Sequence, residues 1–489
     1  MGRDVPVVVF SRDDRRKYRD KVRRCLDVFA QMLREDRFEA DRDRPLAGLE
    51  IELNIVDAAG EAAMCNAAVL AAIEQPDWAT ELGQFNIEIN IEPQELGGDG
   101  PLRLENDVRA RLNHGEERAQ SEGGHLVLIG ILPTLREQEI GEGALSANPR
   151  YRLLNEQIFA ARGEDLHLSI EGIERLDTHA DSITPEAACT SVQLHLQVSP
   201  EQFAAHWNAA QAIAGPQVAV AANSPYLFGK ELHRETRITL FEQATDTRPT
   251  ELKAQGVRPR VWFGERWITS VFDLFEENVL YYPALLPLCD DEDPRAELEQ
   301  GRIPQLHELT LHNGTIYRWN RPVYAVADGA PHLRVENRVL PAGPSVVDIA
   351  ANAAFYYGLM AVLPHAERPI WSQMSFAAAE DNLNSAARHG LDARLYWPGL
   401  GEVSAGELIL RRLLPMAYEG LSKWGVDRPV ADRLLGVIEG RCLSGRTGST
   451  WQVERVQAHG GDRHEALRAM TLEYIERMHG NEPVHTWDV

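Results

Sequence analysis

The sequence predicts an α+β fold, in which an antiparallel sheet with one polar face is flanked by helices. Two observations support this class. Segments that alternate apolar and polar residues, as half-buried strands do, recur up to about residue 340, with helical segments between them. From about residue 346 the pattern is helical. We therefore expect a core over residues 1–345 and a helical C-terminal region over residues 346–489 that packs on it.

The predicted elements follow one another in a mixed order. A charged amphipathic helix at 13–36 precedes the first strand at 48–56. The order continues with a helix at 66–75, a strand at 84–92, a helix at 102–120, a buried strand at 123–133, a strand at 189–200 and an alanine-rich helix at 201–222. The acidic stretch 290–302 is predicted to be a solvated loop. The last strand, 330–344, ends in a Pro-Ala-Gly-Pro cluster, after which the C-terminal helices begin.

The polar faces of four predicted strands have an unusual composition. In GLEIELNIVD, residues 48–57, Leu49 and Ile51 lie on one face while Glu50 and Glu52 lie on the other. The same alternation occurs in FNIEINIEP, SVQLHLQV and LRVENRV, whose polar positions are Asn86, Glu88, Asn90, Glu92, Gln193, His195, Gln197, Arg334, Glu336 and Arg338. None of these faces contains Thr or Lys, which are common on solvated strands. A solvated face explains any one such strand, but the recurrence favours a shared polar interior.

Carboxylates that share an interior surface require compensation, because each one raises the cost of ionising its neighbours. Divalent cations are the natural compensation, and oxygen ligands suit Mg²⁺ or Mn²⁺, which also bridge nucleotide phosphates. The sequence contains no GxGxxG, GxxxxGK[ST], HExxH or GxSxG motif, so any ATP would be held by metals and by arginines on strands. HELTLH at 307–312 and SGRTGST at 444–450 match zinc and phosphate motifs only in part, and we interpret both as structural, the second as a helix-terminating turn.

The composition argues against several classes of partner. A net charge of −24 disfavours binding to nucleic acid or to an anionic membrane, both of which attract basic surfaces. No uninterrupted apolar segment approaches the ~18 residues of a membrane span, and the N-terminal apolar run is too short for a signal peptide. The five scattered cysteines fit neither a disulfide framework nor a zinc ribbon, so we expect a cytoplasmic protein. A homo-oligomer is compatible with the sequence.

Five short motifs resemble those of the glutamate–cysteine ligases and related carboxylate–amine ligases, which share the glutamine-synthetase fold. They are GLEIEL, ELGQFNIEIN, CTSVQLHLQVSPE, RITLFEQATDTR and HLRVENRV, and they occur in the family's order over about residues 50–340. The helical C-terminal region is also similar. The resemblance implies a curved, funnel-shaped antiparallel sheet whose polar face binds ATP, Mg²⁺ (or Mn²⁺) and small-molecule substrates.

The resemblance also implies which residues bind metal. One ion, nearest the transferred phosphoryl group, would be held by Glu50, Gln193 and Glu336. A second ion, beside the amino-acid substrates, would be held by Glu52, Glu81 and Glu88. Glu81 could equally be a turn residue.

The remaining implied roles fall to basic and amide side chains. Arg338 would grip the γ-phosphate, and the nucleotide would lie near His195, Arg334 and Gln197. Substrate carboxylates would be bound by Arg237 and Arg248, and the residues implied to act in catalysis are Arg237 and Arg338. Salt-bridged surface arginines are the alternative interpretation of Arg237 and Arg248.

Some positions depart from the family pattern. Gln193 stands where many members have a metal-binding His, Gln197 replaces an acid, and Phe241 stands where the plant-type branch has Trp. These departures leave the phosphoryl-transfer residues largely intact, but they leave the identity of both substrates undetermined. The implied function is the ATP-dependent formation of a γ-glutamyl amide, from glutamate and cysteine or another amine, through an acyl phosphate. A kinase on the same fold and a non-catalytic nucleotide or amino-acid sensor are the alternatives.

Overall fold

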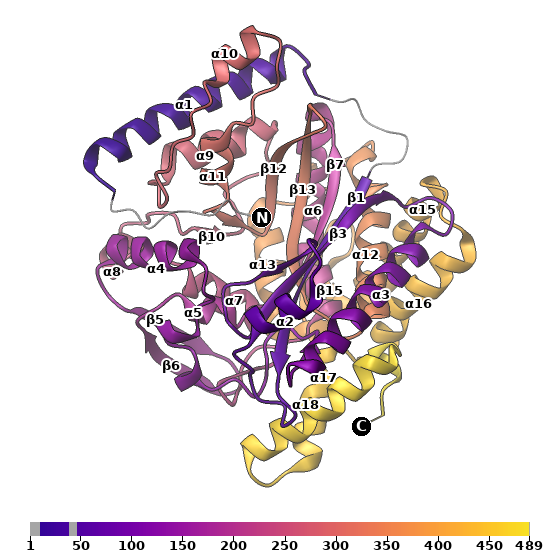
Figure 1. The fold of residues 1–489 in the computed structure, drawn as a ribbon. Helices are drawn as coiled ribbons and strands as arrows, with labels where there is room; N and C mark the ends of the chain where they lie inside the picture. Colours follow the sequence, from indigo (N-terminus) through magenta and orange to yellow (C-terminus); the bar gives the residue numbers. More distant parts are fainter. Residues whose placement is uncertain (1–9, 39–45, 489) are drawn as a thin grey trace.

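The computed structural model describes residues 10–38 and 46–488 and confirms the α+β class (Figure 1). Its centre is a curled seven-stranded antiparallel sheet with the strand order β12-β13-β7-β1-β3-β2, in which β4 also pairs with β1. The strands of this sheet are β1 (Leu46–Val56), β2 (Trp78–Thr80), β3 (Asn86–Glu95), β4 (His125–Val127), β7 (Ser191–Val198), β12 (Asn320–Ala327) and β13 (Ala330–Pro341).

Helices cover the apolar face of the sheet. On β1 the side chains of Leu49, Ile51 and Leu53 are at most 2% exposed. The covering helices are α3 (Gly100–Ser121), α6 (Pro200–Ala221) and α12 (Val346–Met360), and α13 (Phe376–His389) packs on α6. The alanine-rich sequence of α6 lets this helix pack closely against β13, and Tyr357 of α12 donates a hydrogen bond of 2.9 Å to the carbonyl of Gly48. The other face of the sheet therefore remains available for polar side chains.

The N-terminal helix α1 (Arg12–Arg34) begins at Ser11, whose hydroxyl accepts a hydrogen bond from the backbone N–H of Asp14. Its buried side packs against α9 (Val271–Tyr281), α10 (Pro294–Glu299) and α11 (His307–Asn313). The prediction of a loop over 290–302 is therefore wrong in part. Asp293 accepts hydrogen bonds from the backbone N–H groups of Arg295 and Ala296, and Pro294 occupies the first helical position, so this acidic stretch starts a helix.

The strand predicted at 123–133 is shorter than expected, because only His125–Val127 pairs with β1. The following residues are buried, but their backbone groups bond elsewhere. The hydroxyl of Tyr474 donates to the carbonyl of Leu128 at 2.7 Å, and the N–H of Gly130 donates to the carbonyl of Asn223 at 3.3 Å. These bonds tie this extended segment to the C-terminal helix that carries Tyr474 and to the residues that follow α6, rather than to the sheet.

Smaller elements surround the sheet and its covering helices. The helices are α2 (Asn66–Ile73), α4 (Pro149–Arg162), α5 (Thr184–Ala187), α7 (Thr236–Ala244) and α8 (Thr250–Ala254). The strand pairs are β5 (Leu166–Glu171) with β6 (Arg175–Ala180), β8 (Tyr226–Leu227) with β9 (Lys230–Glu231), β10 (Val261–Trp262) with β11 (Tyr317–Arg318), and β14 (Arg394–Trp397) with β15 (Gly401–Ser404). Short 3₁₀ turns lie at 137–139, 142–144, 363–365, 370–372, 390–392 and 484–486.

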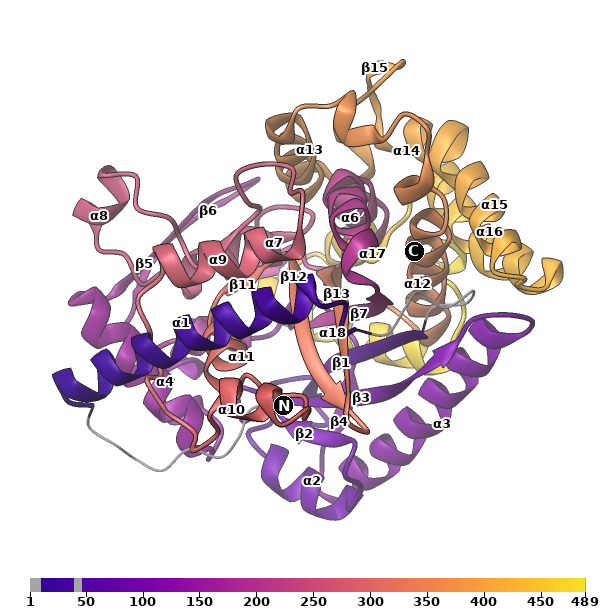
Figure 2. The same cartoon turned by 90° about the horizontal axis from the view of Figure 1, so that it is seen from above.

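The C-terminal region is mostly helical, although the β14–β15 hairpin interrupts its helices. Besides α12 and α13 it contains α14 (Ala405–Leu408), a π-helical turn (Ile409–Leu413), α15 (Leu414–Lys423), α16 (Arg428–Ser444), α17 (Gly448–His459) and α18 (Arg463–Gly480). The SGRTGST segment is the turn between α16 and α17, with Gly445 in the left-handed conformation at φ +69°. Figure 2 shows α12, α13, α14, α15 and α16 on one side of the sheet and α1, α4 and α9 on the other.

One helical segment of the described chain, Val346–His365, is long and apolar enough to cross a membrane. However, 94% of its most apolar window is buried inside the fold, which is typical of a core helix. Most buried apolar residues of the described chain belong to one cluster that includes Tyr18 of α1 and Trp487 beyond α18. The boundary at 345/346 is therefore not marked by a separate core, and it stays a prediction.

Candidate functional site

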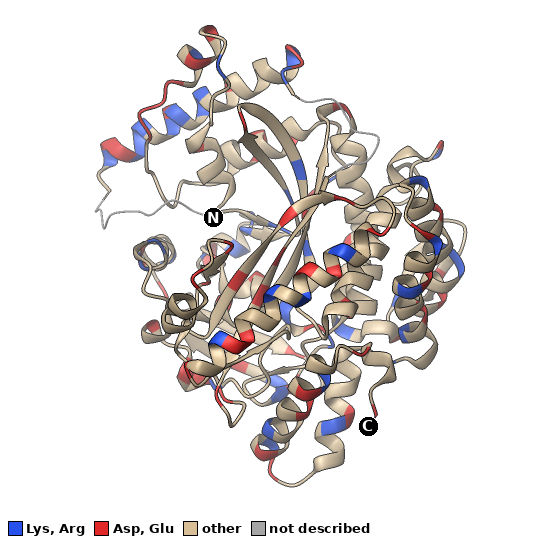
Figure 3. Cartoon of the chain, turned by 45° about the vertical axis from the view of Figure 1, so that its right-hand side comes forward, with Lys and Arg blue, Asp and Glu red and all other residues tan. Residues whose placement is uncertain are grey.

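The register of the sheet brings the predicted polar residues together on one face. Glu52 of β1 lies directly opposite Glu88 of β3, and Glu50 lies opposite Gln193 of β7. On the next pair of strands, Glu336 of β13 lies opposite His195. Figure 3 shows acidic and basic residues close together within the central sheet. This face is thus a polar surface built from four adjacent strands, β3, β1, β7 and β13.

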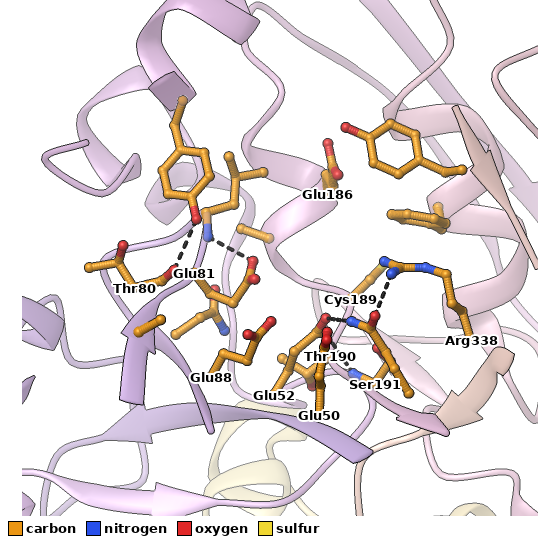
Figure 4. A pocket seen from close by; sticks show the side chains of 18 of the residues that line it. Glu50, Glu52, Thr80, Glu81, Glu88, Glu186, Cys189, Thr190, Ser191 and Arg338 are labelled. Carbon is orange, nitrogen blue, oxygen red and sulfur yellow. Dashed lines mark hydrogen bonds between the residues drawn. The ribbon is translucent and has the colours of Figure 1, made fainter. Parts of the chain in front are cut away.

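A cavity of about 330 Å³ lies over this polar surface. Its floor is formed by strands β1, β2, β3, β7 and β13 and by the segment that leads into β7. Its opposite wall comes from the start of α4, from α5, from α7 and from residues 314–319, whereas Arg321 belongs to strand β12 of the sheet. Figure 4 shows the carboxylates of Glu52, Glu81 and Glu88 gathered on one side of it, with Arg338 on the other. The cavity therefore has an acidic end and a basic end.

The acidic end is a cluster of three carboxylates. One oxygen each of Glu52, Glu81 and Glu88 lies within 4.8 Å of the others. Glu52 accepts hydrogen bonds from the N–H of Ser191 at 2.7 Å and from the amide of Gln193 at 2.8 Å. No Lys or Arg among the described residues forms an ion pair with any of the three carboxylates.

Burial and mutual repulsion make this cluster hard to ionise. Burial, with the charges of Glu50 and Glu52, raises the pKa of Glu88 to about 7. Burial, with the charges of Glu52 and Glu88, also raises the pKa of Glu81 well above its ordinary value. A bound divalent cation would remove this cost, because it supplies positive charge to oxygen ligands that have no basic partner. The residues present thus fit a Mg²⁺ or Mn²⁺ ion.

The residues at the basic end are already engaged with one another. Glu336 accepts hydrogen bonds from Arg321 at 2.9 Å and from Arg338 at 2.6 Å, and Arg338 also donates to the side-chain carbonyl of Gln193. Although burial raises the pKa of Glu336, these two arginines hold it well below its usual range. Nε2 of His195 lies 3.1 Å from a carboxylate oxygen of Glu50. Glu50, Gln193 and Glu336 are therefore close together, but each has a protein partner.

The other predicted residues lie at varying distances from the cavity. Arg237 lines it, but its guanidinium is buried and donates to Glu235 at 2.9 Å and to the carbonyl of Val339. Arg248 does not line it and donates to both carboxylate oxygens of Asp246 at 2.8 Å. His195, Arg334 and Gln197 lie outside the lining, further along β7 and β13, where Arg334 is opposite Gln197. The predicted residues that line the cavity are Glu50, Glu52, Glu81, Glu88, Gln193, Arg237 and Arg338.

Three charged residues of the site were missed by the sequence analysis. Arg150 and Glu186 line the wall opposite the sheet, and Arg321 pairs with Glu336 across strands β12 and β13. Arg321 could have been found, because the Asp-Gly turn at 328–329 predicts a hairpin whose register places it opposite Glu336. Arg150 and Glu186 stand in segments without a chemical motif, and only the folded chain brings them to the cavity.

Two solved structures have the same overall architecture. The glutamate–cysteine ligase of Francisella tularensis, solved in complex with AMP, matches with a TM-score of 0.56 and 13% sequence identity over 91% of each chain. A bifunctional glutathione synthetase from Pasteurella multocida matches with a TM-score of 0.52 and 13% identity, over 89% of the present chain and 53% of that chain. At this identity, the two similarities establish the fold. The comparison with curated proteins found no match to this sequence.

The sequence itself carries the family relationship. The profile of the glutamate-cysteine ligase family 2 (GCS2) matches residues 46–473, which include the whole sheet and most of the C-terminal helices. This match covers the three-carboxylate cluster, Arg338 and the walls of the cavity. The chain therefore belongs to the glutamate–cysteine ligase family 2 and is an ATP-dependent, glutamate–cysteine ligase-like enzyme.

Proposed function

We propose that this enzyme uses ATP and Mg²⁺ (or Mn²⁺) to join the γ-carboxylate of glutamate to an amine, such as that of cysteine. The carboxylate would first take the γ-phosphoryl group of ATP to form an acyl phosphate, and the amine would then displace phosphate. The observation that carries this proposal is the three-carboxylate cluster of Glu52, Glu81 and Glu88, which shares one cavity with Arg338. A cavity with these two ends can bind metal ions and a phosphoryl group side by side.

Two groups of residues would hold metal ions. Glu52, Glu81 and Glu88 form the first group, and its uncompensated charge supports this role. The second group is Glu50, Gln193 and Glu336, which lie together on β1, β7 and β13. When bound, the ions would neutralise phosphate charge and orient the nucleotide.

Arg338 would stabilise the charge that develops on the transferred phosphoryl group. Burial alone lowers the pKa of Arg338, but Glu336 and Glu52 raise it above its ordinary value, so the guanidinium stays charged. Its hydrogen bonds to Glu336 and to Gln193 also fix its orientation before substrates arrive. We place the nucleotide beyond this point, along His195, Arg334 and Gln197.

A substrate carboxylate would bind at the wall opposite the sheet. We propose Arg150 for this contact, because it lines the cavity and its side chain has no hydrogen bond or ion pair to another described residue. The two arginines implied by the family resemblance are less free. The guanidinium of Arg237 is bonded to Glu235, so Arg237 would hold the cavity wall in place. Arg248 is bonded to Asp246 and lies outside the cavity lining.

The test is ADP release from ATP with a panel of amino-acid and amine pairs, in Mg²⁺ and in EDTA. A ligase requires both substrates and metal and releases free phosphate. A kinase on this fold would turn over without the amine and would leave phosphate on its product. A sensor would bind nucleotide or amino acid without releasing ADP. ADP formation that no amine stimulates would contradict the proposed function.

We also propose a cytoplasmic location. All five cysteines are free in the structure. A protein with no disulfide among five cysteines suits a reducing compartment.

A further inference from the structure

Glu186 stands apart from the other carboxylates of the cavity. It belongs to the four-residue helix α5 and faces Glu52 and Glu88 from the opposite wall (Figure 4). Among the described residues, none makes a hydrogen bond or an ion pair with its side chain, and its Oε2 atom is buried without a partner. A buried carboxylate that lacks a partner is costly to keep ionised. Its position in a substrate cavity therefore points to a cationic group of a ligand.

The backbone around Glu186 is held in place by the surrounding structure. The hydroxyl of Thr184 donates to the carbonyl of Gly141 at 3.0 Å, and the N–H of Ile183 donates to the side chain of Asn155 at 2.9 Å. The turn is thus fixed on both sides. A carboxylate on a fixed turn can specify the position of a ligand, because its orientation does not have to be selected on binding.

The wall next to Glu186 also favours a cation. Phe241 forms an aromatic cluster with Tyr317 and with Trp319, each at a centroid distance of 5.6 Å, and all three rings line the cavity. The faces of aromatic rings attract cations, and the guanidinium of Arg237 already lies over the ring of Trp319, 5.7 Å from its centroid. Burial raises the pKa of Glu186 to about 8, and an adjacent positive charge would restore its ionised form at neutral pH.

We propose that Glu186 binds the α-ammonium group of the donor amino acid. This inference rests on the proposed function. In that reaction the acceptor amine must be neutral to attack, whereas a glutamate donor keeps its α-ammonium group from binding to release. The donor therefore presents a permanent cation. Glu186 lies outside the three-carboxylate cluster and, unlike Glu50, which contacts His195, its side chain has no partner among the described residues.

Arg150 supports the same assignment. It comes from the start of α4 and Glu186 comes from α5, and both side chains line the one cavity. An unpaired anion and an unpaired cation at one wall match the ammonium and carboxylate of an α-amino acid. The donor is accordingly a dicarboxylic α-amino acid with a free ammonium group, whose side-chain carboxylate points toward the acidic end of the cavity.

The test compares glutamate with glutarate, which has the same two carboxylates but no ammonium group. Binding of each is measured by calorimetry to the wild type and to Glu186→Gln, with Mg²⁺ and a non-hydrolysable ATP analogue present. We expect the wild type to prefer glutamate, and we expect Glu186→Gln to weaken glutamate binding by about 10-fold or more, the loss of one charge-assisted hydrogen bond, while glutarate binding is unchanged. Glu242→Gln is the control for an effect on the wall alone, because this carboxyl does not line the cavity but accepts a hydrogen bond of 3.3 Å from the indole N–H of Trp319.

Three results would overturn the inference. Unchanged glutamate binding in Glu186→Gln would show that the carboxylate does not contact the ammonium group. An equal loss for glutamate and glutarate would indicate a structural effect on the wall. A loss confined to the amine substrate in ADP-release assays would assign Glu186 to the acceptor. Calorimetry measures binding without turnover. A failure of this inference can therefore be distinguished from a failure of the proposed ligase activity.

Discussion

Glu88 gives the sharpest test of the acidic end of the cavity, because its removal is predicted to stabilise the metal-free protein. Glu88→Gln keeps the shape of the side chain and its contact with the amide of Asn90, which lies 2.8 Å away, but removes the charge opposite Glu52. The pKa of Glu88 rises from the ordinary 4.5 to about 7 in the folded protein. Each pKa unit corresponds to about 1.4 kcal/mol, so ionised Glu88 costs the fold on the order of 3 kcal/mol.

The sign of this effect depends on pH. Below the unfolded pKa of 4.5 the carboxyl is protonated in both states and costs nothing. As pH rises toward the folded pKa of about 7, the unfolded chain releases its proton first, so the stability of the wild type falls through this interval. Above the folded pKa of about 7, the ionised carboxylate lowers the stability of the wild type by its full amount. Glu88→Gln should therefore exceed the wild type in stability by about 3 kcal/mol at pH 8 and match it near pH 4.5.

Urea unfolding in EDTA at the two pH values measures this difference. Glu92→Gln, an exposed glutamate on the same strand, is the control and should show no pH-dependent difference from the wild type. Saturating Mg²⁺ should stabilise the wild type more than Glu88→Gln, because the variant loses a ligand. Equal stability of variant and wild type at pH 8, or a difference that is the same at both pH values, would refute the repulsion argument.

Three further variants separate the roles of the charged residues. Glu336→Gln should lower the free energy of unfolding by about 3 kcal/mol or more in urea titrations, because it leaves Arg321 and Arg338 buried without their shared partner; an unchanged midpoint would contradict this. Arg338→Ala should lower kcat by about 100-fold at saturating substrates, since its contact strengthens in the transition state, and a change confined to KM would contradict this. Arg150→Ala should raise KM for the donor amino acid by about 10-fold with kcat nearly unchanged, and an unchanged KM would exclude the carboxylate contact.

The strand pattern predicted the floor of the site because side chains alternate strictly along a strand. The alternation in GLEIEL and FNIEIN already placed Glu50, Glu52 and Glu88 on polar faces, and antiparallel pairing then set Glu52 opposite Glu88. Glu81 precedes β3 in a turn, so alternation could not place it and only the family resemblance suggested its role. The alternation of residues along the strands and the family motifs were together sufficient to predict the residues on the sheet side of the cavity.

The opposite wall could not be predicted in the same way. Arg150 and Glu186 come from α4 and α5, and their approach to the sheet depends on how these helices pack in the folded chain. The family resemblance offered Arg248 as a substrate contact, whereas the structure pairs it with Asp246 outside the cavity lining. The alternation of residues along a strand therefore identifies the side chains on one face of that strand. Which charged side chains remain unpaired at a cavity depends on how the helices and strands pack together.

The central claim is that ATP activates a carboxylate as an acyl phosphate, and the transfer of oxygen tests it most directly. Glutamate labelled with heavy oxygen in its side-chain carboxylate is supplied with ATP, Mg²⁺ and an amine, and the released products are examined by mass spectrometry. An acyl phosphate loses one carboxylate oxygen to phosphate when the amine displaces it. We predict labelled inorganic phosphate beside unlabelled ADP. Label in AMP would reveal an acyl adenylate, and unlabelled phosphate beside ADP would reveal ATP hydrolysis uncoupled from ligation; either result would contradict the claim.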